Sequence, residues 1–193
     1  MATLILVRHG ESIWNKKGIW TGLTDISLSK EGIEESRQAA SKLRRKKIDI
    51  AHTSLLKRAK ETLDIIKKTL NIPNLHVVEN KALNERDYGK LTGKNKWEIE
   101  KEYGDEKFFQ IRRGWDVPIP KGETLKDVYN RVVPYYQKEI LPKLKEGKNV
   151  LIVAHGNSLR ALIKYIKNIS DEDISKLELK TGDVYFYKVD QTA

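Results

Sequence analysis

The chain has 193 residues, of which 37 are lysine or arginine and 27 are aspartate or glutamate, giving a formal net charge of +10. A chain of this length can bury a substantial hydrophobic core as one unit, so we expect a single domain over residues 1–193. The sequence contains no cysteine, which excludes disulfides, thiolate metal sites and cysteine nucleophiles.

The excess of positive charge would suit nucleic acid, an anionic membrane surface or a small anionic substrate, because all three respond to the same long-range potential. Charge alone does not choose among them. Four cations at 44–47 have a local explanation, since they close a predicted helix and complement the negative end of its dipole. The apolar run near the N-terminus spans only residues 4–7. This is too short for a secretory signal or a membrane span, and we expect a cytoplasmic protein.

Short apolar runs predict five β-strands, in chain order at 4–7, 48–52, 76–78, 150–154 and 184–189. Helical spacing occurs at 29–43, 59–70, 97–103, 106–112, 125–144 and 157–166, and we expect the fifth of these helices to be interrupted at Pro134. This order predicts an α/β fold, a three-layer sandwich with a mostly parallel central sheet flanked by helices. We expect residues 82–145, approximately, to form a small helical cap insertion.

Two of the four histidines share one setting: His9 and His155 each follow an apolar strand and precede a glycine. Chance gives such a pair in roughly 2% of chains of this composition, which favours a shared function over two structural histidines in turns. Ligands of an open parallel sheet bind beyond the carboxyl ends of its strands, so both rings can face one site. His52 and His76 lack this setting and are expected to be structural.

Charged side chains near these histidines indicate phosphoryl transfer. Arg8 directly precedes His9, and guanidinium groups bind phosphate oxygens in pairs. Further cations occur where loops are expected: Arg58, Arg86, Lys96, Arg112 and Arg113. Glu85 lies in a polar loop and suits a general acid and base, although a loop glutamate paired with Arg86 is an equal alternative. Asn157 opens a helix whose free N–H groups favour an anion. The sequence has no metal-ligand spacing such as His-Glu-x-x-His, so no metal is expected.

These segments resemble a known family. Residues 6–12 (Leu-Val-Arg-His-Gly-Glu-Ser) are similar to the signature of the histidine phosphatase superfamily, and residues 154–158 (Ala-His-Gly-Asn-Ser) to its second histidine segment. Four further stretches, at 20–22, 56–59, 83–96 and 112–114, resemble the phosphoglycerate mutases of that superfamily that depend on 2,3-bisphosphoglycerate. The likeness runs from about residue 4 to residue 188, and the stretch at 83–96 and the paired arginines at 112–113 are its most specific parts.

The resemblance implies an enzyme of glycolysis and gluconeogenesis that interconverts 3-phosphoglycerate and 2-phosphoglycerate through a phosphohistidine primed by 2,3-bisphosphoglycerate. It implies that His9 is the nucleophile, that Arg8, Arg58 and His155 surround the moving phosphoryl group, and that Glu85 gives and takes the proton. The residues implied to bind phosphate or carboxylate groups are Asn15, Thr21, Gly22, Arg86, Tyr88, Lys96, Arg112, Arg113 and Asn157. The implied partners are phosphorylated glycerates, without nucleic acid or membrane, and we expect a monomer or a homodimer.

The likeness departs from longer members of the family in three places. Residues 114–124 stand where those members have a larger insertion, the chain stops at Ala193 where they continue with a tail that helps to cover the site, and Ile19 stands where many have a basic residue. We expect a shorter cover to admit water to the phosphohistidine more easily. The alternative is therefore a histidine-dependent phosphomonoesterase that uses the same five catalytic residues.

A nucleic-acid-binding module is a second alternative, from a different class of protein. The net charge of +10 and four tryptophans, Trp14, Trp20, Trp97 and Trp115, suggest it. The tryptophans are scattered along the chain and are not interleaved with a basic stripe, which favours a packing role for them.

Overall fold

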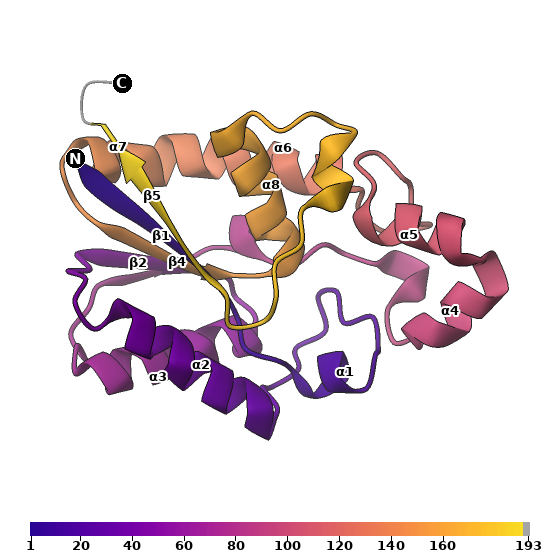
Figure 1. The fold of residues 1–193 in the computed structure, drawn as a ribbon, viewed down its shortest axis with the longest axis horizontal. Helices are drawn as coiled ribbons and strands as arrows, with labels where there is room; N and C mark the ends of the chain where they lie inside the picture. Colours follow the sequence, from indigo (N-terminus) through magenta and orange to yellow (C-terminus); the bar gives the residue numbers. More distant parts are fainter. Residues whose placement is uncertain (191–193) are drawn as a thin grey trace.

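The computed structural model describes residues 1–190 and contains one five-stranded sheet (Figure 1). In spatial order, its strands are β3 (Val77–Glu79), β2 (Ile50–Thr53), β4 (Val150–Ala154), β1 (Ala2–Arg8) and β5 (Val184–Val189). The first four strands run parallel to their neighbours, and β5 pairs antiparallel with β1 at the edge. The predicted α/β fold with a mostly parallel sheet is confirmed.

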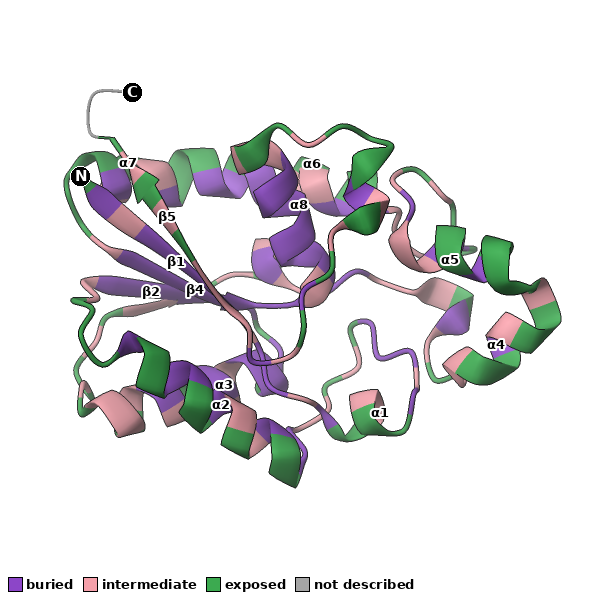
Figure 2. Ribbon diagram, viewed as in Figure 1, coloured by how far each residue is buried: buried purple, intermediate pink, exposed green. Residues whose placement is uncertain are grey.

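Helices cover both faces of the sheet. On one face lie α2 (Lys30–Leu43) and α3 (Lys57–Leu70), and on the other α6 (Leu125–Tyr135), α7 (Leu141–Lys145) and α8 (Gly156–Lys167). Side chains of β1 alternate between two cores, because Leu4 and Leu6 pack in the α6 and α8 layer while Ile5 and Val7 pack in the α2 and α3 layer. Figure 2 shows the central strands buried and the helices exposed only on their outer faces. Cover on both faces explains why these strands show no polar alternation in the sequence.

A third and smaller core lies beyond the end of the sheet. There α4 (Lys96–Tyr103) and α5 (Asp105–Arg113) pack around Trp20 and Leu91. Three short elements also lie outside the two layers: α1 (Ile13–Lys16), η1 (Lys81–Leu83) and η2 (Gly89–Leu91). The segment expected to form the cap divides between two places. Its part at 96–113 joins this outer core, whereas its part at 125–145 packs on the sheet with Leu125, Val132 and Ile140 in the main core.

The prediction that Pro134 interrupts its helix is wrong, because Pro134 lies inside α6, which continues to Tyr135. The irregular part follows as a π-helical turn, η3 (Tyr136–Ile140), before α7. Pro134 lacks the N–H that would bond to the carbonyl of Asn130, but both residues face solvent, where water can serve that carbonyl. Buried neighbours such as Val133 hold the helix against the sheet on its other side.

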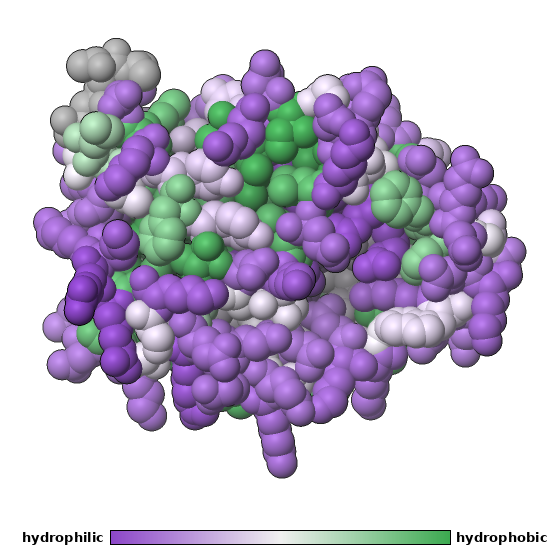
Figure 3. Space-filling model, in the orientation of Figure 1, coloured by the Kyte–Doolittle hydropathy of each residue, from purple (hydrophilic) through white to green (hydrophobic). Residues whose placement is uncertain are grey.

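The surface is mostly hydrophilic. On the face drawn in Figure 3, hydrophobic side chains gather over β5 and α8, where Phe186 is 42% exposed at the sheet edge. Within residues 1–190, no helix is long and apolar enough to cross a membrane.

Candidate active site

The ends of β1 and β4 bring the two distant histidines together. The strands pair in register from Leu4 with Val150 to Arg8 with Ala154, and the backbone N–H of His9 donates to the Ala154 carbonyl at 3.0 Å. The ring centroids of His9 and His155 are therefore 4.9 Å apart, although 146 positions separate the residues. This is the edge of the sheet where ligands of parallel folds bind.

The His9 ring is held in its neutral form, with one nitrogen free. Its Nδ1 lies 2.6 Å from the carbonyl oxygen of Gly10, and a carbonyl only accepts, so Nδ1 carries the hydrogen and Nε2 keeps its lone pair. Burial, followed by the charges of Arg58 and Arg8, lowers the pKa of His9 well below 6.5. At neutral pH Nε2 is therefore free to attack phosphorus.

A close backbone contact fixes the turn that carries this ring. A Cβ atom on Gly10 would lie 2.1 Å from the carbonyl oxygen of Gly32 at the start of α2, and one on Gly32 would lie 2.0 Å from the Glu11 carbonyl oxygen. Only glycine allows the two backbones to approach this closely. The Gly10 N–H also donates to the hydroxyl of Thr62 in α3, at 3.1 Å. The turn after β1 is thus tied to both helices of that layer.

His155 is oriented by a serine that the sequence analysis did not single out. The hydroxyl of Ser54 lies 2.7 Å from Nε2 of His155, and both side chains are fully buried. Burial, followed by the charge of Arg58 and the proximity of His9, lowers the pKa of His155 well below 6.5. Its Nδ1 is buried and meets no hydrogen-bond partner among residues 1–190. Ser54 directly follows β2, which neighbours β4, so the strand order could have pointed to it.

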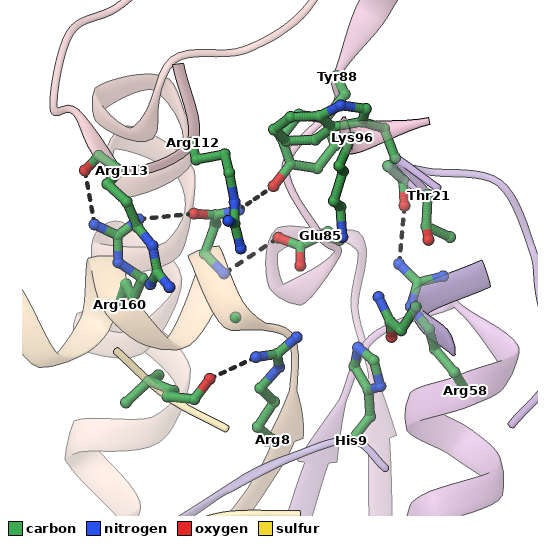
Figure 4. A pocket seen from close by; sticks show the side chains of 16 residues that line it. Arg8, His9, Thr21, Arg58, Glu85, Tyr88, Lys96, Arg112, Arg113 and Arg160 are labelled. Atoms are coloured by element: carbon green, nitrogen blue, oxygen red, sulfur yellow. Dashed lines mark hydrogen bonds between the residues drawn. The ribbon is translucent and has the colours of Figure 1, made fainter. Parts of the chain in front are cut away.

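The guanidinium groups of Arg8 and Arg58 lie on either side of the His9 ring (Figure 4). Arg58, near the start of α3, donates to the carbonyls of Gly22 and Thr24 at 2.8 and 3.0 Å, and burial lowers its pKa to about 10. Arg8 ends β1, donates to the Leu179 carbonyl, and has a buried Nε that meets no acceptor within the described residues. Burial lowers the pKa of Arg8 as well. Arginine side chains keep their charge at neutral pH, so both guanidinium groups can donate to a bound anion.

Glu85 is 8% exposed and stands across the pocket from His9 (Figure 4). Its Oε1 accepts from the backbone N–H of Arg86 at 2.8 Å and from that of Asn157, in the first turn of α8, at 3.2 Å. The carboxylate is thus held by amides and is not paired with the Arg86 side chain. That placement suits a group that exchanges a proton with a bound ligand.

The opposite end of the pocket is also cationic. Lys96 opens α4, Arg112 and Arg113 close α5, and Tyr88 lies beside Lys96 at this end (Figure 4). Burial, with Arg112 and Arg8 as the largest charges, lowers the pKa of Lys96 to about 8. Like charges held this close indicate a site that is completed by a polyanion.

The structure brings nearly all the residues implied by the resemblance into one pocket. Those lining it are Arg8, His9, Asn15, Thr21, Gly22, Arg58, Glu85, Tyr88, Lys96, Arg112, Arg113 and Asn157. His155 contacts this group through the His9 ring. Arg86 does not line it, because its buried guanidinium donates to the carbonyls of Ile111, Val117 and Glu123 and ties the loop to the outer core. The lining residues that the sequence analysis missed are Trp20, Gly156, Arg160 and Leu179.

Charge is distributed unevenly over this lining. Six cations face one carboxylate, that of Glu85, in the part of the pocket formed by the described residues. Within residues 1–190, there is no group of three or more histidine, aspartate or glutamate side chains arranged to hold a metal ion. Positive charge at this site is supplied by arginine and lysine side chains.

Comparisons with known proteins identify relatives of this chain. Residues 4–193 match the model of the histidine phosphatase superfamily (branch 1). A 2,3-bisphosphoglycerate-dependent phosphoglycerate mutase of Parvibaculum lavamentivorans is 45% identical over 189 residues, covering 97% of this chain and 90% of that protein. One from Chelativorans sp. is 48% identical over 189 residues, covering 97% and 92%.

Solved structures share the fold at lower sequence identity. Bacillus stearothermophilus YhfR superposes with a TM-score of 0.84 at 26% identity, covering 98% of this chain and 92% of that one. A mycobacterial glucosyl-3-phosphoglycerate phosphatase in complex with VO3 superposes with a TM-score of 0.82 at 22% identity, covering 96% and 92%. At that identity the second likeness concerns the fold alone.

Proposed function

Because this chain belongs to the histidine phosphatase superfamily, we propose that it is a 2,3-bisphosphoglycerate-dependent phosphoglycerate mutase, which interconverts 3-phosphoglycerate and 2-phosphoglycerate in glycolysis and gluconeogenesis. Relatives 42–48% identical over nearly the whole chain carry that name. The observation that carries the proposal is the pocket itself, where six cations and one carboxylate surround two neutral histidines.

The reaction follows from the roles that the side chains can take. His9 Nε2 forms a bond to phosphorus while the bond from phosphorus to the ester oxygen of the ligand breaks. Arg8 and Arg58 stabilise the negative charge on the transferring group from both sides. Glu85 donates a proton to the departing oxygen and takes one from the acceptor hydroxyl when the phosphoryl group returns. His155, held by Ser54, presents its second nitrogen to the same group.

The pocket fits a bisphosphorylated glycerate. The buried Arg8 Nε and His155 Nδ1, both lacking partners among the described residues, lie at the reacting end. Lys96, Arg112 and Arg113 form the other end, where a second anionic group can bind. When bound, 2,3-bisphosphoglycerate supplies the phosphoryl group that primes His9. A ligand with two anionic groups engages both ends at once, and a simple phosphate monoester engages only one.

A phosphomonoesterase would use the same groups and differ in the acceptor, because water in place of a glycerate hydroxyl would release phosphate. The discriminating experiment follows 3-phosphoglycerate isomerisation and phosphate release in parallel, with and without added 2,3-bisphosphoglycerate. We expect isomerisation that depends on the bisphosphate and exceeds phosphate release. Rapid hydrolysis of a generic phosphate ester, with no isomerisation under either condition, would show the phosphatase to be correct.

A further inference from the structure

One arginine of the pocket lining is buried and is used by none of the steps above. Arg160, in α8, is 3% exposed. Its guanidinium donates to the carbonyls of Leu177 and Ile174 at 3.1 and 2.7 Å and to that of Arg113 at 2.8 Å. Its fourth bond goes from Nη1 to Oδ1 of Asn157 at 3.0 Å. Among residues 1–190, Arg160 forms no ion pair, and burial lowers its pKa to about 10, so it carries an uncompensated charge at neutral pH.

The bond from Arg160 decides which way the Asn157 amide faces. A guanidinium has donors and no acceptor, so only the oxygen of the amide can face it. The Asn157 NH2 group must then point away, and it donates to the hydroxyl oxygen of Tyr88 at 2.7 Å (Figure 4). The amide orientation is thereby fixed by chemistry as well as by packing.

The orientation of the Asn157 amide in turn fixes the role of the Tyr88 hydroxyl. Its hydroxyl oxygen accepts from Asn157, so its hydrogen must be donated elsewhere, and residues 1–190 offer it no acceptor. Burial, together with the charge of Glu85, raises the pKa of Tyr88, so the phenol stays protonated. The ring is held against Trp20 with centroids 4.5 Å apart, and Tyr88 lines the pocket. The hydrogen of Tyr88 is therefore available to a ligand atom.

We propose that Arg160 is a positioning residue, an inference that rests on the proposed function. Arg160 sets the donor-to-acceptor direction of the hydrogen-bond series from Arg160 through Asn157 to Tyr88, so that Tyr88 always donates to an anionic oxygen of the glycerate ligand. This hydrogen-bond series makes this end of the pocket selective for a hydrogen-bond acceptor, namely a phosphate or carboxylate oxygen. Arg160 also holds the backbone of Arg113, another cation at the same end.

The substitution Asn157→Asp tests the direction of this hydrogen-bond series. It replaces the donating NH2 with an accepting oxygen of similar size and keeps an acceptor for Arg160. Tyr88 must then donate to that new oxygen, and its hydrogen is lost to the ligand. The measurement is the dissociation constant of 3-phosphoglycerate by calorimetry, on enzyme that carries no phosphoryl group, for wild type, Tyr88→Phe, Asn157→Asp and the double variant.

We expect Tyr88→Phe to weaken binding about tenfold in the wild-type background and less than about twofold in the Asn157→Asp background. The added negative charge weakens binding in both Asn157→Asp variants equally and cancels in this comparison. An equal cost of Tyr88→Phe in both backgrounds would mean that the hydroxyl acts only through packing. The inference would then be wrong, as it would be if the substitution costs nothing in either background.

Variants of Arg160 test whether it is the cause. In Arg160→Lys, the side chain still donates and cannot accept, so Tyr88→Phe should still raise the dissociation constant about tenfold. In Arg160→Met, the amide is free to turn, and that cost should fall to about threefold or less. Equal costs in the lysine and methionine backgrounds would contradict the role of Arg160. If Arg160→Met does not fold, Arg160→Gln takes its place, because an amide can donate or accept and no longer fixes the Asn157 orientation; a roughly tenfold effect of Tyr88→Phe in that background would contradict the role of Arg160.

A second ligand separates this inference from the proposed function. Inorganic phosphate can enter the pocket whatever the natural substrate is, so the same titrations are repeated with it. Tyr88-dependent binding of phosphate, without isomerisation of 3-phosphoglycerate, would overturn the mutase and keep the positioning role. Isomerisation with no Tyr88 dependence for either ligand would keep the mutase and overturn the positioning role.

Discussion

Lys96 should make anion binding depend on pH in a range where the rest of the site does not titrate. Its pKa is lowered from 10.5 to about 8, first by burial and then by the positive charges of Arg112 and Arg8. A bound phosphate or carboxylate supplies the missing negative charge and returns the pKa toward its usual value. The ligand therefore binds the protonated form of Lys96 better.

The sign and size of the effect follow from proton linkage. Below about pH 8, Lys96 of the free enzyme already carries its proton, and the affinity is at its full value. Above that pH, Lys96 must take up a proton when the ligand binds, and the affinity falls. With a pKa of about 8 in the free enzyme and a pKa in the complex that the bound anion raises above the assay range, the dissociation constant should rise about tenfold between roughly pH 7 and pH 9. His9 and His155 are already neutral over this range, and the pKa of Arg58 is about 10. The ligand phosphate is fully ionised there.

The assay is a calorimetric titration with 3-phosphoglycerate across this pH range at constant ionic strength. Lys96→Met should bind more weakly at about pH 7 and show a flat profile. Lys96→Arg keeps a charge that does not titrate here and should also be flat, with affinity near that of wild type. A wild-type profile without slope, or the same slope in Lys96→Met, would refute the reasoning.

Three further predictions concern other parts of the site. His9→Ala should abolish isomerisation and also the acid-labile phosphate formed on the protein from labelled 2,3-bisphosphoglycerate, whereas surviving label would place the nucleophile elsewhere. Ser54→Ala should lower kcat about tenfold with little change in KM, because His155 loses the group that orients it, and an unchanged kcat would contradict that role. Gly10→Ala should lower the free energy of unfolding by about 2 kcal/mol or more, since its Cβ meets the Gly32 carbonyl; a denaturant midpoint equal to that of wild type would oppose this.

Local pattern in the sequence was sufficient for the strands and for most of the helices. The runs at 4–7 and 150–154 were predicted because burial on both faces demands continuous apolar residues, and β1 and β4 fall there. The paired setting of His9 and His155 was visible for the same reason, as each follows such a strand. Pro134 was misjudged because its effect on a helix depends on which side meets water, and the local sequence does not show that side.

Contacts between distant segments could not be predicted from local sequence pattern, because they depend on strand order, parallel register and buried distances. Arg86 and Arg160 are both arginines close in sequence to implied site residues. In the structure, Arg86 donates to the carbonyls of Ile111 and Val117 in the outer core and to that of Glu123, whereas Arg160 donates to Asn157. Ser54 became a partner of His155 only because β2 neighbours β4.

The sequence by itself determined the layered α/β fold, the pairing of His9 with His155 and the excess of positive charge near them, because periodicity and residue chemistry are local properties. The tertiary structure alone decided which nitrogen of His9 is free, which arginines line the pocket and which way the Asn157 amide points. These depend on donors and acceptors that come from distant segments and meet only when the chain has folded.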